Sequence, residues 1–408
     1  MIFKKTQLEN GLTIIAEVGA AARSLALGFF VRTGARDETP EISGVSHYLE
    51  HMLFKGTPGR SALEVNLEFD RMGAKYNAFT SEENTVFYAA VLPEYQEQVL
   101  DLWADLMRPA LRDDDFTTEK GVILEEIAMY KDLPHFDVQD RARKLHFGAH
   151  PCGNSVLGSN ESITALTAAQ MREYFQRRYV PNNLVLAATG KIDWPKLVDQ
   201  ARALCAGWQP ASSARALRDF RGTGARETVR QEKVQREHIC LLSAAPPEQS
   251  PLRYAANVLS SIIGDDTNSR YYWALVDNAL ADAADMDYDS QDGTGAYYTY
   301  LSCDPELAAK VVGIVRAELA RVQKEGVTEA ELLAAKNKIA SSATLHGELP
   351  MGRLVPLGFG WQYRQEYIPL ADEIAAIQAV TPADIRRVIA EYPFEPLTQI
   401  GLGPLEKI

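Results

Sequence analysis

The chain has 408 residues, 46% of them apolar and 24% charged, and its 55 acidic and 42 basic side chains give a formal net charge of −13. This is the composition of a globular protein with a large core, which excludes disorder as the dominant state. The acidic balance argues against a nucleic acid as partner, because binding a phosphate backbone requires a basic face. No segment approaches the roughly 18 consecutive apolar residues of a membrane span, so a membrane is not expected as a partner either.

The N-terminal segment and the cysteines indicate a cytoplasmic protein. The first five residues include two lysines, and Gln, Glu and Asn follow where a secretory signal peptide carries an apolar run. The four cysteines are far apart and form no CxxC pair. Such spacing is typical of a reducing compartment and argues against a zinc site built from thiolates.

An internal repeat with an offset of about 212 residues sets the predicted architecture. The matching pairs of segments are 26–34 with 238–246, 84–94 with 295–306, the helical stretches that begin at Glu119 and Glu331, and 166–175 with 380–389. Each copy reads as alternating strand-like segments, then helices, then a late helix and a closing strand. We therefore predict an α+β fold of two tandem homologous domains, each a mainly antiparallel sheet with helices packed on one face.

The predicted domains are residues 1–210 and 229–408, joined by a linker at 211–228. The linker segment is polar and rich in arginine, and it shows neither helical nor strand periodicity. The cluster of Arg215, Arg218 and Arg221 within it is expected to be solvated.

The chemistry is predicted in the first domain, where residues 47–51 read His-Tyr-Leu-Glu-His. The surrounding segment lacks internal Gly and Pro and can be helical. Residues four apart share one face of a helix, so His47 and His51 can bind one metal ion while Glu50 projects beside them. A catalytic zinc site needs a third protein ligand and one open position for water. That ligand must come from another segment.

The leading candidate for the third ligand lies in the amphipathic segment 117–132, which carries Glu119, Glu125 and Glu126. Glu119 and Glu126 are two helical turns apart and share a face, whereas Glu125 is rotated by about 100° from its neighbour. We assign Glu126 as the ligand and Glu119 as a carboxylate that orients a ligand or the water. Taken alone, this helix would favour the plainer interpretation that its carboxylates are solvated.

The repeat provides an internal test of the assignment. The second copy replaces His47, Glu50, His51 and Glu126 by Leu259, Ile262, Ile263 and Lys338 respectively. All four side chains are exchanged together for groups that cannot bind zinc, while the apolar and turn features of the repeat persist. The scaffold therefore does not require these polar residues, which favours a functional role for them in the first copy.

With these motifs the chain resembles the pitrilysin and mitochondrial-processing-peptidase family of inverted zincins over essentially its whole length. The matching stretches are residues 33–38, 43–57, 72–94, 119–134, 150–163 and 179–193. The resemblance implies that His47, His51 and Glu126 hold one Zn²⁺ per chain, that Glu50 is the general base and that Glu119 supports the site. It also implies that Asn77, Ala78, Phe79 and Thr80 border an edge strand to which an extended peptide substrate adds by main-chain pairing.

The chain departs from the family in the second domain. Active members carry an Arg followed seven residues later by a Tyr that contact substrate, and alignment from Ser269 and Arg270 places Val276 and Ala283 there. Tyr288 could replace the Tyr only if the register slips. We therefore expect a zinc endopeptidase subunit that acts on short or unfolded peptides in a chamber formed with a homologous partner, which lacks HxxEH and supplies the Arg and Tyr. The alternatives are a non-catalytic peptide-binding or assembly subunit and a self-sufficient homodimeric peptidase.

Overall fold

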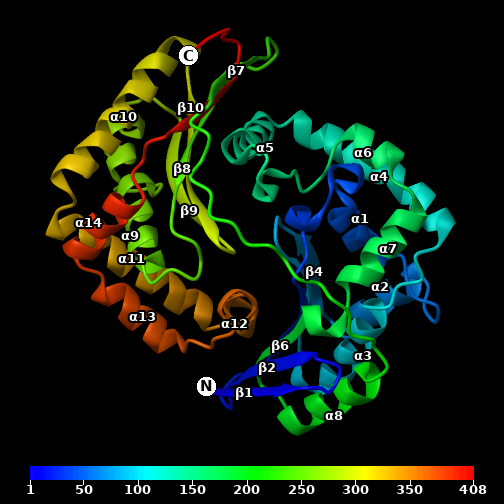
Figure 1. Ribbon diagram of the computed structural model, residues 1–408. Helices are drawn as coiled ribbons and strands as arrows, with labels where there is room; N and C mark the ends of the chain where they lie inside the picture. The colour runs from blue at the N-terminus through cyan, green and yellow to red at the C-terminus, as the bar shows by residue number, and fades with distance from the viewer. The chain divides into compact units, whose positions relative to one another are not determined.

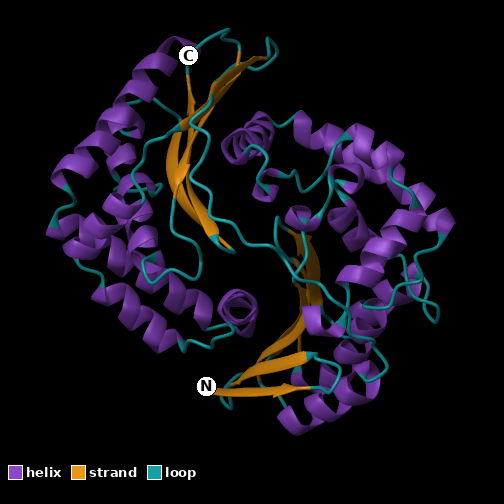
Figure 2. Ribbon diagram, viewed as in Figure 1, coloured by secondary structure: helices purple, strands orange, loops and turns teal.

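The computed structural model describes all 408 residues and divides into two compact units. Unit 1 comprises Met1–Ile127, Asn154–Ala216 and Thr344–Ile368, and unit 2 comprises Ala128–Gly153, Leu217–Ala343 and Pro369–Ile408. Each unit contains one sheet with helices packed against it (Figures 1 and 2). The predicted α+β class, with two homologous parts, is confirmed.

The sheet of unit 1 has six strands in the order β1-β2-β6-β3-β5-β4. The strands are β1 (Ile2–Gln7), β2 (Thr13–Val18), β3 (Leu25–Val31), β4 (Lys75–Thr80), β5 (Thr85–Val91) and β6 (Leu184–Gly190). Only β2 and β6 pair in parallel, and the other neighbours are antiparallel. Strand β4 is an edge of this sheet, so the main-chain groups along its outer side face no other strand.

The sheet of unit 2 repeats this plan with five strands in the order β7-β11-β8-β10-β9. The strands are β7 (Arg226–Arg230), β8 (Glu237–Ala244), β9 (Ala283–Gln291), β10 (Thr294–Cys303) and β11 (Thr398–Gly403). Here β7 and β11 are the parallel pair. Strands β2, β3, β4, β5 and β6 of unit 1 thus have their counterparts in β7, β8, β9, β10 and β11, as the offset of the repeat predicts.

Helices form most of the remaining regular structure of both units. Unit 1 contains α1 (Val45–Leu53), α2 (Ala62–Arg71), α3 (Gln96–Leu106), most of α4 (Asp113–Lys131), α6 (Asn160–Ala165), α7 (Ala168–Arg178), α8 (Trp194–Cys205) and α12 (Pro350–Arg364). Unit 2 contains α5 (Pro134–Phe147), α9 (Arg253–Gly264), α10 (Ala308–Glu325), most of α11 (Glu329–Gly347), α13 (Leu370–Ala379) and α14 (Pro382–Glu391).

Helices cover both faces of each sheet, whereas the sequence pattern predicts them on one face only. Alternate residues of β3 point to opposite faces, and Leu27 and Phe29 join the main core while Ala26 and Phe30 pack against α12. In unit 2 the single helix on the second face is α5. A whole strand of buried residues such as β3 is what two-sided burial requires.

The compact units differ from the contiguous domains predicted at 1–210 and 229–408. Helix α5 precedes the predicted linker but belongs to unit 2, and α12 follows it but belongs to unit 1. A buried ion pair anchors α12, since Arg353 Nε lies 2.9 Å from Glu17 Oε2 of β2. Sequence periodicity does not say which sheet a helix covers.

The predicted linker has no helix or strand from residue 211 to 225, and β7 begins within its last residues. Arg218 and Arg221 are exposed, as expected. The expectation that Arg215 is solvated is wrong, because only 3% of its side chain is exposed. Its guanidinium is instead satisfied by carboxylates and a backbone carbonyl of unit 1.

Candidate active site

Helix α1, which carries the HxxEH pattern, begins at a site that only glycine can occupy. Gly44 has φ +92°, and a Cβ there would lie 2.6 Å from the carbonyl oxygen of Leu157. The helix has no side-chain cap of its own. Instead, Gly44 N and Ser46 N donate to the buried carboxylate of Glu38 at 2.6 and 2.7 Å. Burial raises the pKa of Glu38 to about 7 although both bonds oppose the shift, and its carboxyl oxygens satisfy N–H groups that the helix leaves free.

Burial of α1 fixes the direction of its polar side chains. Tyr48, Leu49 and Met52 are at most 1% exposed and lie in the core of unit 1. His47 and His51 therefore lie on one side of the helix, with ring centroids 4.8 Å apart.

The two imidazoles meet the carboxylate of Glu126, which lies on α4. Glu126 Oε2 is 3.7 Å from His47 Nε2 and 3.5 Å from His51 Nε2, and the three ligand atoms all lie within 4.8 Å of one another. These separations are too long for hydrogen bonds. Two zinc ligands at about 2.1 Å in a tetrahedral arrangement are about 3.4 Å apart, which is close to both distances.

Burial shifts the pKa values of the cluster, and at His51 the hydrogen bond with Glu119 and the nearby carboxylates outweigh burial and raise the pKa. Burial, with a smaller contribution from His51, lowers the pKa of His47 to about 3, so its imidazole is neutral and can ligate. Burial raises the pKa of Glu126, and its Oε2 atom is buried without a hydrogen-bond partner. An unsatisfied carboxylate oxygen facing two imidazole nitrogens is what a divalent cation would relieve. The residues present therefore fit a zinc ion with three protein ligands.

Glu119 lies one layer behind the ligands and orients His51. Its Oε1 is 2.9 Å from His51 Nδ1, and its Oε2 is 2.5 Å from Lys55 Nζ. Burial alone would raise the pKa of Glu119, but the contacts with His51 and Lys55 outweigh it and the pKa is lowered. The hydrogen bond leaves Nε2 of His51 directed at Glu126, which fits the role predicted for Glu119.

Glu50 projects beside the cluster and is held by the neighbouring strand. Thr80 Oγ1 donates to Glu50 Oε2 at 2.6 Å. Burial raises the pKa of Glu50 and the bond from Thr80 partly opposes this shift. A carboxylate with a raised pKa is better suited to accept a proton than an exposed one.

Residues predicted to border an edge strand lie within it. Asn77, Ala78, Phe79 and Thr80 belong to β4, and their partners on the inner side are in β5. Ala78 is buried and Thr80 faces Glu50, whereas Phe79 lies on the opposite face, 6.2 Å in ring centroid from Phe359 of α12. The structure thus brings Glu50 next to an edge strand whose outer main-chain groups can pair with a peptide.

The positions of the second copy that correspond to the cluster are filled differently. Leu259, Ile262 and Ile263 lie on α9 and are at most 4% exposed within the core of unit 2. Lys338 Nζ lies 2.5 Å from Asp265 Oδ1, so the counterpart of Glu126 makes an ion pair. Among the His, Cys, Asp and Glu side chains of the chain, His47, His51 and Glu126 form the only group of three with metal-ligand spacing.

Other polar residues considered from the sequence lie elsewhere. Glu125 is exposed and does not join the cluster. His146 and His150 belong to unit 2, where His146 Nδ1 is 3.1 Å from Thr398 Oγ1 and His150 Nε2 is 3.2 Å from the carbonyl oxygen of Arg218. Tyr288 donates to the carbonyl of Pro246 at 2.8 Å.

Sequence reasoning missed the supporting contacts of Glu38, Lys55 and Thr80. Lys55 follows His51 by four residues, which is a usable signal for a shared face. The partners of Glu38 and Thr80 depend on how separate segments pack, and no local pattern announces them.

Comparison with known proteins places this site in a family. The profile described as insulinase, peptidase family M16, matches residues 1–160, and that described as peptidase M16 inactive domain matches residues 165–339. The uncharacterized zinc protease SCO5738 of Streptomyces coelicolor is 32% identical over 413 residues, covering 99% of this chain and 90% of that protein. The mitochondrial-processing peptidase subunit beta of Pongo abelii is 27% identical, covering 99% of this chain and 85% of that protein.

The solved structures agree on the fold. The crystal structure of a protease from Helicobacter pylori superposes with a TM-score of 0.91 at 21% identity, covering 98% of this chain and 99% of that one.

No helix in this chain is both long and apolar enough to span a bilayer.

The resemblance drawn from the motifs is confirmed by matches that extend over nearly the entire length. This chain belongs to peptidase family M16, the insulinase family, whose relatives include proteins named zinc proteases.

Proposed function

We propose that this chain is the zinc-bearing subunit of a cytoplasmic endopeptidase that cleaves short or unfolded peptides in a chamber formed with a partner. The observation that carries the proposal is the convergence of His47, His51 and Glu126 beside Glu50 and an edge strand. The relatives named zinc proteases support the reaction class. The four cysteines are buried and form no disulfide, which supports a reducing compartment.

In this proposal, three side chains hold the metal and the others handle protons and substrate. Zinc, when bound, would supply Lewis-acid polarisation of a peptide carbonyl and a water molecule of lowered pKa. Glu50 accepts the proton of the attacking water and returns a proton to the leaving amine. Thr80 fixes the carboxylate of Glu50, and the outer side of β4 orients the peptide by main-chain hydrogen bonds. No serine or cysteine nucleophile is needed.

The partner is inferred from what unit 2 lacks. Val276 and Ala283 stand at the positions where active members carry Arg and Tyr, and neither side chain can donate a hydrogen bond to substrate. A homologous subunit without HxxEH could supply both groups. The same absence is the observation that favours the second candidate, a non-catalytic peptide-binding subunit. A third candidate is a homodimer that is active without another chain.

Cleavage of an internally quenched peptide separates these candidates. We expect little hydrolysis by the purified chain, strong hydrolysis after addition of the homologous partner, loss of it with a chelator and recovery with zinc. Glu50→Gln should keep its zinc and lose about 10²- to 10⁴-fold in kcat, because a general base contributes that much.

Each alternative predicts a different result. Full activity of the single chain would establish the homodimer, and absence of hydrolysis in the zinc-loaded pair would establish the binding subunit. Unchanged turnover by the Glu50→Gln variant would remove Glu50 as the base.

A further inference from the structure

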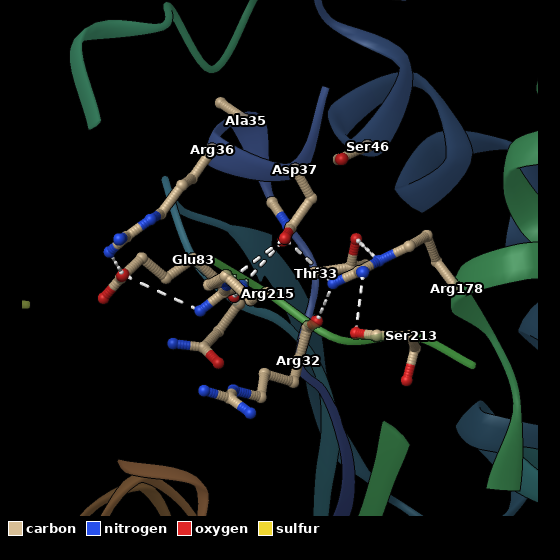
Figure 3. Close-up of polar contacts among 12 residues, drawn as sticks. Arg32, Thr33, Ala35, Arg36, Asp37, Ser46, Glu83, Arg178, Ser213 and Arg215 are labelled. Carbon is tan, nitrogen blue, oxygen red and sulfur yellow. Dashed lines mark hydrogen bonds and ion pairs between the residues drawn. The ribbon is translucent and has the colours of Figure 1, made fainter. Parts of the chain in front are cut away.

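Arg215 comes from the segment that joins the two halves of the sequence, yet its side chain is buried in unit 1 (Figure 3). Arg215 Nε and Nη2 donate to the two oxygens of Asp37 at 3.0 and 2.6 Å, and Nη2 also donates to the carbonyl of Glu83 at 2.7 Å. Two parallel N–H···O bonds to one carboxylate are the strongest arrangement that an arginine can make. The contact therefore fixes both the linker and the loop that holds Asp37.

The carboxylates of Asp37 and Glu83, which pair with Arg215, also pair with two further buried arginines. Arg178 Nη2 lies 3.0 Å from Asp37 Oδ1, and Arg36 Nη1 lies 2.5 Å from Glu83 Oε1. The exposed fraction of these five side chains is 6% or less. Charges buried in this way depend on each partner, since removing one leaves another without compensation.

Arg178 attaches the linker a second time. Its Nη1 donates to the carbonyl of Ser213 at 3.0 Å, and its Nε donates to Thr33 Oγ1 at 3.1 Å (Figure 3). The linker is thus bound to unit 1 at Ser213 through its main chain and at Arg215 through its side chain. Only the second contact can be altered by substitution within the linker.

The two residues that accept hydrogen bonds from Arg215 are close in sequence to residues of the candidate active site. Asp37 immediately precedes Glu38, whose carboxylate accepts from the first amides of α1. Glu83 lies in the turn between β4 and β5, three residues after the Thr80 that holds Glu50. One guanidinium therefore ties together the loop that caps the metal-binding helix and the turn that follows the strand beside the base.

We infer that Arg215 is a positioning residue of the peptidase site, acting through Asp37 on the start of α1 and through Glu83 on the end of β4. The inference rests on the proposed function and adds the linker to the machinery of that site. Lysine cannot replace this arginine, because a single ammonium group cannot make the paired bonds to Asp37 and reach the Glu83 carbonyl in the same plane.

The test uses the full-length chain with Arg215→Lys and Arg215→Ala, and with Arg218→Ala as the matched control. Arg218 is an exposed arginine three residues further along the same segment. The first readout is hydrogen exchange of the zinc-free protein at the amides of Gly44 and Ser46 and in the turn 81–84. We expect exchange there to be about tenfold faster in both Arg215 variants, which corresponds to about 1.4 kcal/mol of local opening. The control should match the wild type.

Two further readouts separate positioning from general stability. Zinc affinity, measured by competition with a chelator, should fall about tenfold in Arg215→Lys, in the range seen when groups that orient metal ligands are altered. With the partner present, kcat should fall more than KM rises. If Arg215→Ala does not fold, Arg215→Lys decides the question.

Unchanged local exchange and zinc affinity in Arg215→Lys would overturn the inference, and so would faster exchange spread evenly over unit 1. Failure of the proposed function is distinguishable, because in that case the wild type cleaves no peptide even with zinc and the partner present. The exchange readout requires neither metal nor substrate and would still report on Arg215.

Discussion

At the scale of single residues, Glu119 contacts both His51 and Lys55 but is not one of the three candidate metal ligands. We expect Glu119→Gln to lower zinc affinity about 10- to 100-fold, because an amide is a weaker acceptor for His51 Nδ1 than a carboxylate. Competition with a chelator measures this directly. The matched control is Glu125→Gln on the same helix, whose exposed side chain should leave the affinity unchanged. Equal affinities in both variants would remove Glu119 from the support of the site.

The metal-binding cluster could be predicted from sequence because its pattern is local. A spacing of four places His47 and His51 on one face, and the repeat shows that unit 2 folds without either. Thr80 and Arg215 could not be found this way, since their partners Glu50 and Asp37 are 30 and 178 residues away in the chain. A charged residue in a polar segment reads as solvated unless its partner is known.

At the scale of elements, helix α5 fastens the linker to unit 2 through His146. The side chain of His146 contacts Thr398 at 3.1 Å, and its carbonyl accepts from Thr223 N at 3.0 Å. Gly222 lies over the ring at φ +85°, where a Cβ would be 2.4 Å from His146 Cε1. The ring is fully buried.

Burial, with a smaller contribution from Arg143, lowers the pKa of His146 from its usual 6.5 to about 4. Between these values the unfolded chain binds the proton and the folded chain does not, so the free energy of unfolding rises with pH across this window. The contribution is fully present above about pH 6.5, is lost as the pH falls toward 4, and amounts to about 3 kcal/mol at most.

Urea unfolding as a function of pH tests this contribution. His146→Gln should show a shallower loss of stability between pH 6.5 and 4 than the wild type. His135→Gln, on the same helix, is the control and should keep the wild-type slope. An identical slope in His146→Gln would contradict the assignment of the pH dependence to this ring.

The two-sided packing of the sheets has a signal in the sequence. Strand β3 is apolar at successive positions, and all seven of its residues are buried. A strand covered on one face alternates apolar and polar residues, so a continuous run predicts a second covering layer. The helix that supplies this layer cannot be chosen from periodicity, because α5 and α12 each cover strands that are distant from them in the chain.

At the scale of the whole molecule, unit 1 is assembled from three separate segments of the chain. The segment Thr344–Ile368 contributes α12, with Leu354, Leu357 and Trp361 packed on one face of the sheet. It also contributes Arg353, the partner of buried Glu17. A fragment that ends at residue 216 would expose this apolar face and leave Glu17 unpaired.

We therefore expect the fragment 1–216 to aggregate or to unfold without cooperativity, and to regain a cooperative transition when it is co-expressed with residues 344–368. The same peptide with Leu354→Asp is the control and should not restore the transition. Thermal unfolding followed by circular dichroism reads out both. Cooperative unfolding of the fragment alone would show that 1–210 is a self-sufficient domain.

The central claim is that one zinc ion is held by His47, His51 and Glu126. The most direct test is zinc content by elemental analysis, together with zinc affinity, in the wild type, Glu126→Gln and Glu125→Gln. The account predicts one zinc per chain in the wild type and in Glu125→Gln. In Glu126→Gln it predicts that the zinc affinity falls by about 100-fold or more. Full occupancy at unchanged affinity in Glu126→Gln would contradict it.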